Sequence, residues 1–450
     1  MRDPHALATR AVRLVASHPL GRWVGQRAYR AVARAAGSAL APIPGVTAVY
    51  LAGSATRPSR IDPGHSDLDL VLVTELGDVE EELRMREALR RRLRAGRALV
   101  PALHQADYVD AVDLSLLRRF PNAWSMGFDE RWERLAGRDV RLSVAPAIDA
   151  RQRRLEPLRR SLRRWTKATV VLRDPKRPDA LRNARRLYAD VAAAWLEADR
   201  LAPLDVLSTR AGHPDASRRG PVALLGAALT LLERFALEVA PVGAAPFAVE
   251  GTPPSAPDLE ALDRAAGQAG LGPVVVGSRD PCSTDRVVFV RAPAGCDAED
   301  AVARMTRVAA ASAPGGWIDH PVLLTAPLWR AGWLLDVPPF AGASLALASP
   351  DDPPPAPARE DLEAILPVLL VERLLRARGR GFRLRAASDP LRAAWREVRS
   401  LAPALEALLD GGPVVFRDAP SRLPGEAELL EATRALSDRL HARYPAGGAA

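Results

Sequence analysis

Two short apolar runs joined by a polar loop constrain the fold of this chain more than any other feature of its sequence. The first run, Val46–Leu51, is rich in β-branched residues and is followed by Gly53 and Ser54. The second run, Asp67–Val73, places leucines at every other position. The loop between the runs contains glycine and proline, which favour turns. The pattern predicts two strands of one sheet, connected by a turn-rich loop.

Two carboxylates at the start of the second strand predict a metal site. Residues two apart in a strand point to the same face of a sheet, so Asp67 and Asp69 lie side by side while the leucines fill the other face. Two anions this close repel each other unless a cation lies between them. Hard cations such as Mg²⁺ take oxygen ligands and usually retain waters and substrate phosphates. We therefore expect half of a Mg²⁺–phosphate site here; the alternative is a pair of solvated acids at a strand end.

The Gly53–Ser54 pair supplies groups that suit the phosphate. Glycine lets the backbone approach a ligand closely, and a turn can aim N–H groups at phosphate oxygens. The serine hydroxyl adds a further donor. Arg57 follows closely and suits a triphosphate, although in an arginine-rich chain it is also an ordinary surface charge.

Composition narrows the class of protein. The chain has 450 residues, of which 48% are hydrophobic, and this is enough apolar surface for several globular domains. No apolar run is long enough to cross a bilayer, so we expect no membrane partner. Two cysteines and seven scattered histidines argue against a disulfide framework and a zinc site, and they predict a reduced, cytoplasmic protein.

The net charge of +9 suggests an anionic partner. Only two of the basic residues are lysines, however, and no stripe of basic and aromatic residues stands out. We therefore do not expect general nucleic-acid binding. Residues 1–40 are arginine-rich and helical in pattern, with charges throughout. They lack the apolar centre of a secretory signal, so we expect an ordinary helix, with a transit peptide as the alternative.

Hydrophobic periodicity divides the chain into four regions. Residues 1–145 read as a helix followed by a strand–loop–strand–helix–strand unit, in which residues 106–117 form the last strand. Apolar residues spaced by three and four predict a helical domain over 150–240. A mixed α/β region of unknown role, 258–346, contains two strand-like runs, "GPVVVGS" and "RVVFVRA". After a proline-rich linker, residues 361–443 are helical again.

The stretch "LAGSATRPSRIDPGHSDLDLVLV" resembles the signature of the DNA polymerase beta-type nucleotidyltransferase superfamily. Its small bacterial members (the minor nucleotidyltransferases) and the aminoglycoside nucleotidyltransferases carry hydrophobic–Gly–Gly/Ser, a loop, and then Asp–hydrophobic–Asp/Glu–hydrophobic; the loop is slightly longer here. The resemblance covers about residues 40–145. It implies an α/β fold of the nucleotidyltransferase (α+β) type, with a small mixed sheet flanked by helices. A helical domain and a mixed, mainly helical C-terminal half would follow.

The superfamily usually places a third carboxylate on a later strand. In "YVDAVDLSLL" the run "VDAVDL" resembles "VDLVDL" of the small bacterial members, and its first aspartate corresponds to Asp110. Asp107 and Asp113 are the alternatives, and they share the opposite face of the strand from Asp110. Residues 131–142, "RWERLAGRDVRL", also resemble the element that follows the family core, an apolar helix end before Gly-x-Asp.

The resemblance implies transfer of a nucleoside monophosphate, AMP from ATP in the first instance, to a hydroxyl acceptor with release of pyrophosphate. Asp67, Asp69 and Asp110 would hold two Mg²⁺ ions, and Asp110 would also be suited to accept the proton of the acceptor hydroxyl. The β- and γ-phosphates would lie against Gly53 and Ser54, with Arg57 neutralising charge. The acceptor would be a small molecule, as in the aminoglycoside and lincosamide enzymes, or a protein, as in the antitoxin members that adenylylate a partner.

Two other functions stay open for the chain. A non-catalytic nucleotide- or partner-binding module would keep the fold without the reaction. Template-independent RNA nucleotide addition would require a wide basic cleft.

Two further stretches have a functional and an ordinary interpretation. Lys167, one of only two lysines, suits a phosphate contact or an ordinary solvated helix face. The run 274–290 faintly repeats the opening stretch, but Arg286 and Val287 stand where a second carboxylate would be needed, so we expect no metal there.

Overall fold

The computed structural model describes the chain in segments that form two compact units. The described residues are 12, 14–52, 56, 68–99, 109–119, 132–140, 150–177, 179–199, 220–239, 242–243, 249–250, 260–272, 274–278, 286–311, 321–334, 356–357, 371, 374, 395, 398, 414–415 and 425–443. Unit 1 comprises Met1–Ala147, Pro367–Val398 and Ser421–Ala450, and unit 2 comprises Ile148–Leu366 and Arg399–Pro420. No helix in these segments is both long and apolar enough to cross a membrane.

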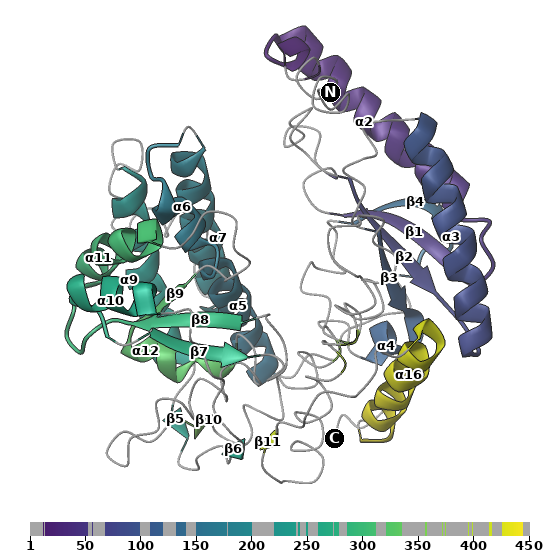
Figure 1. Ribbon diagram of the computed structural model, residues 1–450. Helices are drawn as coiled ribbons and strands as arrows, with labels where there is room; N and C mark the ends of the chain where they lie inside the picture. The colour runs from purple at the N-terminus through teal and green to yellow at the C-terminus, as the bar shows by residue number, and fades with distance from the viewer. Residues whose placement is uncertain are drawn as a thin grey trace. The chain divides into compact units, whose positions relative to one another are not determined.

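Unit 1 is a small mixed sheet flanked by helices (Figure 1). Its strands lie in the order β3-β2-β1-β4, with β1 antiparallel to β2 and β4, and β2 parallel to β3. This confirms the predicted mixed sheet at the level of architecture. Its elements are α2 (Pro19–Leu40), β1 (Val46–Ala52), β2 (Asp69–Thr74), α3 (Val79–Leu99), β3 (Val109–Asp113), α4 (Leu114–Arg119), β4 (Glu133–Gly137) and α16 (Glu426–Arg443).

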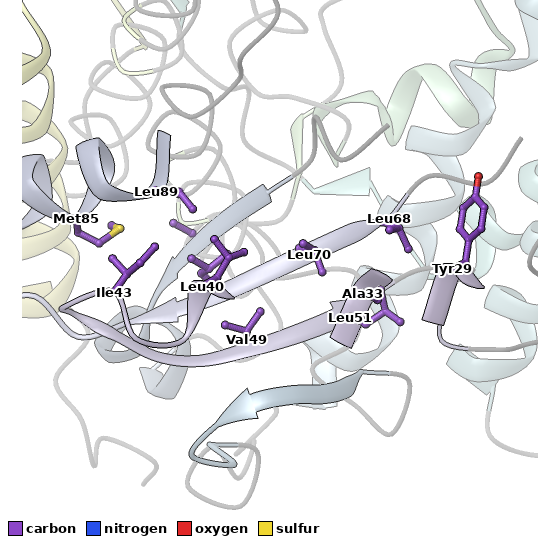
Figure 2. Close-up of a cluster of buried hydrophobic side chains, with 12 residues drawn as sticks. Tyr29, Ala33, Leu40, Ile43, Val49, Leu51, Leu68, Leu70, Met85 and Leu89 are labelled. Carbon is purple, nitrogen blue, oxygen red and sulfur yellow. The ribbon is translucent and has the colours of Figure 1, made fainter. Parts of the chain in front are cut away.

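One face of this sheet is covered by α2 and α3. The leucines of β2 point toward these helices, as their alternation predicts, and they meet side chains from every neighbouring element (Figure 2). Each member of this cluster is at most 8% exposed, so its burial is a main source of stability in unit 1. The cluster consists of Tyr29, Ala33, Leu40, Ile43, Val49, Leu51, Leu68, Leu70, Leu72, Met85, Leu89 and Ala111.

The opposite face of the sheet is organised by a buried tyrosine of β1. The Tyr50 hydroxyl donates to Asp139 Oδ1 (3.1 Å) and accepts the N–H of Val140 (2.9 Å). Its ring packs against buried Trp132, with ring centroids 5.7 Å apart. The buried Tyr50 hydroxyl thus both donates and accepts a hydrogen bond. These two bonds hold the residues after β4 against the centre of the sheet.

The third strand is shorter than predicted. The alternation in residues 106–117 predicted one strand, but β3 ends at Asp113 and Leu114 begins α4. The Asp113 carboxylate accepts the N–H of Ser115 (2.8 Å) and, more weakly, that of Leu116 (3.4 Å). Asp113 therefore provides an N-cap, which favours a helix start and ends the strand.

Residues 133–137 form a strand, whereas the sequence predicted a helix end. β4 pairs with β1 and ends at Gly137, which has φ +80°. A Cβ at this position would lie 2.4 Å from the Thr47 carbonyl oxygen, so the close approach of the two strands requires glycine. The pairing with β1 decides the conformation, because "ERLAG" has no marked strand propensity of its own.

The C-terminal helix α16 packs on α3 through charged groups. Arg434 donates to the carbonyl oxygens of Leu76, Gly77 and Asp78 at 3.0–3.1 Å, in the turn before α3. Within α3, buried Arg86 pairs with buried Glu82 (3.0 Å). Glu426 of α16 accepts from Arg86 (3.4 Å) and from Arg90. These contacts place the C-terminal helix in the same unit as β1 and β2.

Unit 2 is mainly helical with a small three-stranded sheet, in the order β7-β8-β9. As predicted, "PVALLGAALTLLERFALEV" forms a largely buried helix and the runs at 274–278 and 286–291 form paired strands. Its helices are α5 (Ala150–Trp165), α6 (Ala168–Arg173), α7 (Ala180–Asp199), α9 (Pro221–Val239), α10 (Glu260–Gln268), α11 (Ala298–Ala311), α12 (Ala326–Arg330) and η7 (Gly332–Leu334). Its strands are β5 (Val242–Gly243), β6 (Val249–Glu250), β7 (Val274–Ser278), β8 (Arg286–Arg291), β9 (Val322–Leu324), β10 (Ala356–Pro357) and β11 (Val414–Val415).

We predict that Arg86→Met lowers the free energy of unfolding of unit 1 by about 3 kcal/mol, because it leaves buried Glu82 without its partner. The double variant Glu82→Leu/Arg86→Met should recover most of this loss, since it removes both charges. Urea titration monitored by hydrogen exchange of α3 amides measures the effect in unit 1 alone. Arg91→Met is the matched control, because its pair with Glu87 is exposed and should contribute little. Equal losses for Arg86→Met and Arg91→Met would contradict the prediction.

We predict that Tyr50→Phe destabilises unit 1 by about 1–3 kcal/mol. The change keeps the ring but removes the acceptor for the Val140 N–H and the donor to Asp139. The urea midpoint of the amides in β1 and β4 measures this loss. An unchanged midpoint would mean that water replaces the hydroxyl at no cost.

Candidate functional site

The described part of the candidate site is the junction of β1 and β2. The two strands are antiparallel, and the last residue of β1, Ala52, pairs with the first residue of β2, Asp69. Residues that pair directly across a sheet point to the same face. The Asp69 carboxylate therefore lies on the same sheet face as the Ala52 methyl group of β1.

Asp69 lies at the boundary between the core and solvent. It is half-buried, whereas Leu68, Leu70 and Val71 around it are at most 3% exposed. A carboxylate on such an apolar support is partly desolvated, which strengthens its interaction with a cation. Among the side chains that the structure describes, Asp69 is the oxygen ligand at this strand end that fits a hard cation such as Mg²⁺.

Most of the other predicted site residues lie outside the described residues. These are Gly53, Ser54, Arg57 and Asp67. Gly53 follows Ala52 in the chain and Asp67 precedes Asp69 by two residues, so both flank the described junction in sequence. Their predicted roles stay predictions.

The register of β2 and β3 fixes the backbone position of Asp110. Asp110 pairs with Val71, two residues after Asp69 in the same strand. Because residues two apart in a strand share a face, the Asp110 position lies on the sheet face that carries Asp69. The next residue, Ala111, belongs to the cluster on the helix-covered face, which agrees with this alternation. The strand pairing thus places two of the three predicted carboxylate positions on one face.

Asp113, one of the two alternatives to Asp110, lies elsewhere. It pairs with Thr74 at the opposite end of β2, five residues from Asp69, which corresponds to roughly 16 Å along the strand. Its carboxylate is engaged with the N-terminus of α4. The other alternative, Asp107, lies outside the described residues.

Within the described segments, no three His, Cys, Asp or Glu side chains gather closely enough to hold a metal ion. The three predicted ligands cannot enter such a group, because the side chains of Asp67 and Asp110 are not among those described.

A second charged feature lies in unit 2, around the turn between α5 and α6. Lys167 is exposed in this turn, and Arg163, Arg164 and Arg186 surround it, with Arg164 paired to Asp190 at 2.6 Å. Partial burial of the ammonium group, followed by the positive charges of these arginines, lowers the pKa of Lys167. The arrangement favours an anion, and the exposure of Lys167 agrees with a solvated helix end.

Sequence reasoning missed two features of these sites. Within the helical domain predicted over 150–240, the helix breaks at Thr166 and Lys167 into α5 and α6, and Lys167 is exposed at this break. The pairs Arg153–Arg154 and Arg163–Arg164 were the available signal for a basic surface. No local sequence pattern could predict the hydrogen bond between Tyr50 and Asp139, because the two residues are 89 positions apart in the chain.

Comparisons of the chain with protein-family models, curated proteins and solved structures found no match. The resemblance to the nucleotidyltransferase superfamily therefore depends on the motif residues between 40 and 145. The geometry of the β1–β2 junction is an independent observation on the same residues.

Proposed function

We propose that unit 1 is a nucleotidyltransferase domain that moves a nucleoside monophosphate, AMP from ATP in the first instance, to a hydroxyl acceptor. The observation that carries the proposal is the pairing of Asp69 with Ala52, which brings the start of the acidic strand beside the residue before Gly53–Ser54. A phosphate-binding glycine turn and a metal-binding carboxylate must be neighbours to hold one metal-chelated triphosphate.

The mixed sheet supports the same proposal. Its central strand β2 carries Asp69 at its first residue, and the neighbouring parallel strand carries Asp110 on the same face. The opposite face is filled by the leucine cluster, so the sheet is rigid where the carboxylates begin. Catalysis by metal-bound carboxylates depends on such fixed positions.

Each residue has a chemical role in the proposal. Bound Mg²⁺ would neutralise phosphate charge and raise the acidity of the acceptor hydroxyl. Asp67, Asp69 and Asp110 would hold two Mg²⁺ ions, and Asp110 would also accept the proton of the acceptor hydroxyl. Gly53 and Ser54 donate hydrogen bonds to the β- and γ-phosphates, and Arg57 balances the charge of the departing pyrophosphate. The acceptor class, small molecule or protein, is the part that an experiment must identify.

We predict that Asp69→Asn lowers magnesium-dependent label transfer from α-labelled ATP at least about a hundredfold, because a neutral amide is a poor ligand for a hard cation. Purified protein is incubated with labelled ATP and a cell extract that provides acceptors, and pyrophosphate release is followed in parallel. Asp113→Asn is the matched control, since asparagine can also cap α4 and the residue lies at the other end of β2. Loss of transfer in both variants, or in neither, would contradict the assignment.

We also predict that chelation by EDTA abolishes both label transfer and pyrophosphate release, and that added Mg²⁺ restores them. The physical reason is that the carboxylates repel the triphosphate unless a cation lies between them. Nucleotide binding measured by calorimetry separates the outcomes. Magnesium-dependent ATP binding without transfer to any acceptor would favour a non-catalytic nucleotide-binding module, and ATP binding that is independent of metal would contradict the proposed site.

A further inference from the structure

Exposed apolar side chains concentrate in the first turns of α2 and in the short segment before it. Of the eight large hydrophobic residues that are exposed in the described segments, six lie within residues 12–24, and the other two lie in unit 2. The six are Val12, Leu14, Val15, Leu20, Trp23 and Val24, at 37–77% exposure. A contiguous apolar patch of this kind commonly marks an interaction surface.

The patch is not an extension of the core face of α2. The buried face of this helix consists of Tyr29, Ala33, Gly37 and Leu40. At 3.6 residues per turn, the centre of the Leu20, Trp23 and Val24 stripe lies roughly 140° around the helix from that face. The first turns of α2 also extend beyond the sheet of unit 1 (Figure 1). Packing among the described residues of unit 1 therefore does not account for apolar residues at these positions.

The charged residues of the segment that carries the patch are all positive. Residues 4–61 contain eight arginines and no aspartate or glutamate. Arg22 and Arg27 are exposed beside the patch, and the Arg27 guanidinium stacks 3.9 Å from the centre of the Trp23 ring. Further along α2, Arg30 pairs with Glu133 of β4, so that arginine has a structural partner within the unit. The patch thus combines leucine, valine and tryptophan with exposed arginines.

These features discriminate between the occupants of the surface. A second copy of the chain would bring the same arginines against each other in a two-fold interface, and no acid within residues 4–61 would compensate them. An anionic bilayer offers both an apolar layer and negative charge at its surface. Tryptophan and arginine suit that boundary, because each has an apolar body and a polar end.

We propose that the described residues 12 and 14–27, called the α2 surface here although residues 12–18 precede the helix, bind an anionic lipid bilayer, with α2 lying in the interface. Leu14, Leu20, Trp23 and Val24 enter the boundary of the acyl chains, while Arg22 and Arg27 contact lipid phosphates. The expectation of no membrane partner depends on the lack of a bilayer-spanning run, and a helix that lies in the interface needs no such run.

The test is flotation of the full-length protein with vesicles. We expect binding to vesicles of equal parts phosphatidylcholine and phosphatidylglycerol, little binding to phosphatidylcholine alone, and weakening as salt is raised. Arg22→Gln/Arg27→Gln should weaken the partition into vesicles roughly thirtyfold, since each arginine near an anionic surface strengthens binding by roughly five- to sixfold. Leu20→Ser/Trp23→Ser should weaken it at least about tenfold, at low salt and at high salt alike.

Matched controls separate a local surface from the overall charge. Arg264→Gln/Arg307→Gln removes the same charge from exposed positions of unit 2, and Leu237→Ser removes an exposed leucine there. Both should leave flotation unchanged. Circular dichroism of each variant verifies that the fold is intact.

Three results would overturn the proposal. The first is no flotation with anionic vesicles, and the second is an equal loss for the α2 and the unit 2 arginine pairs. The third is that the protein does not bind vesicles but associates with itself or binds poly-glutamate, and that Leu20→Ser/Trp23→Ser abolishes this association. This last result would assign the surface to a protein partner.

Discussion

The antiparallel pairing of β1 with β2 is the constraint on which the rest of unit 1 depends. A slip of one residue in this register would turn Leu68, Leu70 and Leu72 toward the opposite face and move Asp69 into the apolar cluster. Burying an unpaired carboxylate would cost several kcal/mol, and the three leucines would have to fit where Val71 and Val73 are now buried. The leucine face therefore fixes the register, and the register fixes which side of the sheet carries the acid. The core thus determines on which face the candidate site lies.

Helix α3 transmits this constraint to the far end of the chain. Met85 and Leu89 contact the sheet, while Arg86 and Arg90 of the same helix hold Glu426 of α16. Arg86 is fully buried, so its charge requires the two carboxylates around it. A buried charge that needs partners from two helices specifies how these helices pack more strictly than apolar contacts alone. This explains why a helix some 340 residues later in the chain joins the unit that contains β2.

The sequence was sufficient to predict the elements whose periodicity is determined by burial. The strands at 46–52 and 69–74, the helix at 221–239 and the paired strands at 274–291 follow from apolar spacing alone, and so does the position of Asp69 at a strand start. It was not sufficient where a tertiary contact decides. β4 exists because Gly137 can approach Thr47, and β3 ends where Asp113 caps α4. Contacts such as Arg434 with the turn before α3 join residues too distant in sequence for a local pattern to reveal.

The distribution of charge over the sheet agrees with the proposal that the acidic site takes its cation from solution. α2 carries four arginines, but it covers the leucine face, and Arg30 and Arg34 are directed to Glu133. The sheet therefore lies between these arginines and the face that carries Asp69. The arginines of α2 cannot balance a pair of carboxylates on the other side of this apolar layer. To approach the carboxylates, a guanidinium group would have to lose its hydration, and this desolvation would offset the energy gained. The positive helix and the acidic strand can therefore serve different partners within one small unit, one at a lipid surface and one at a metal-bound phosphate.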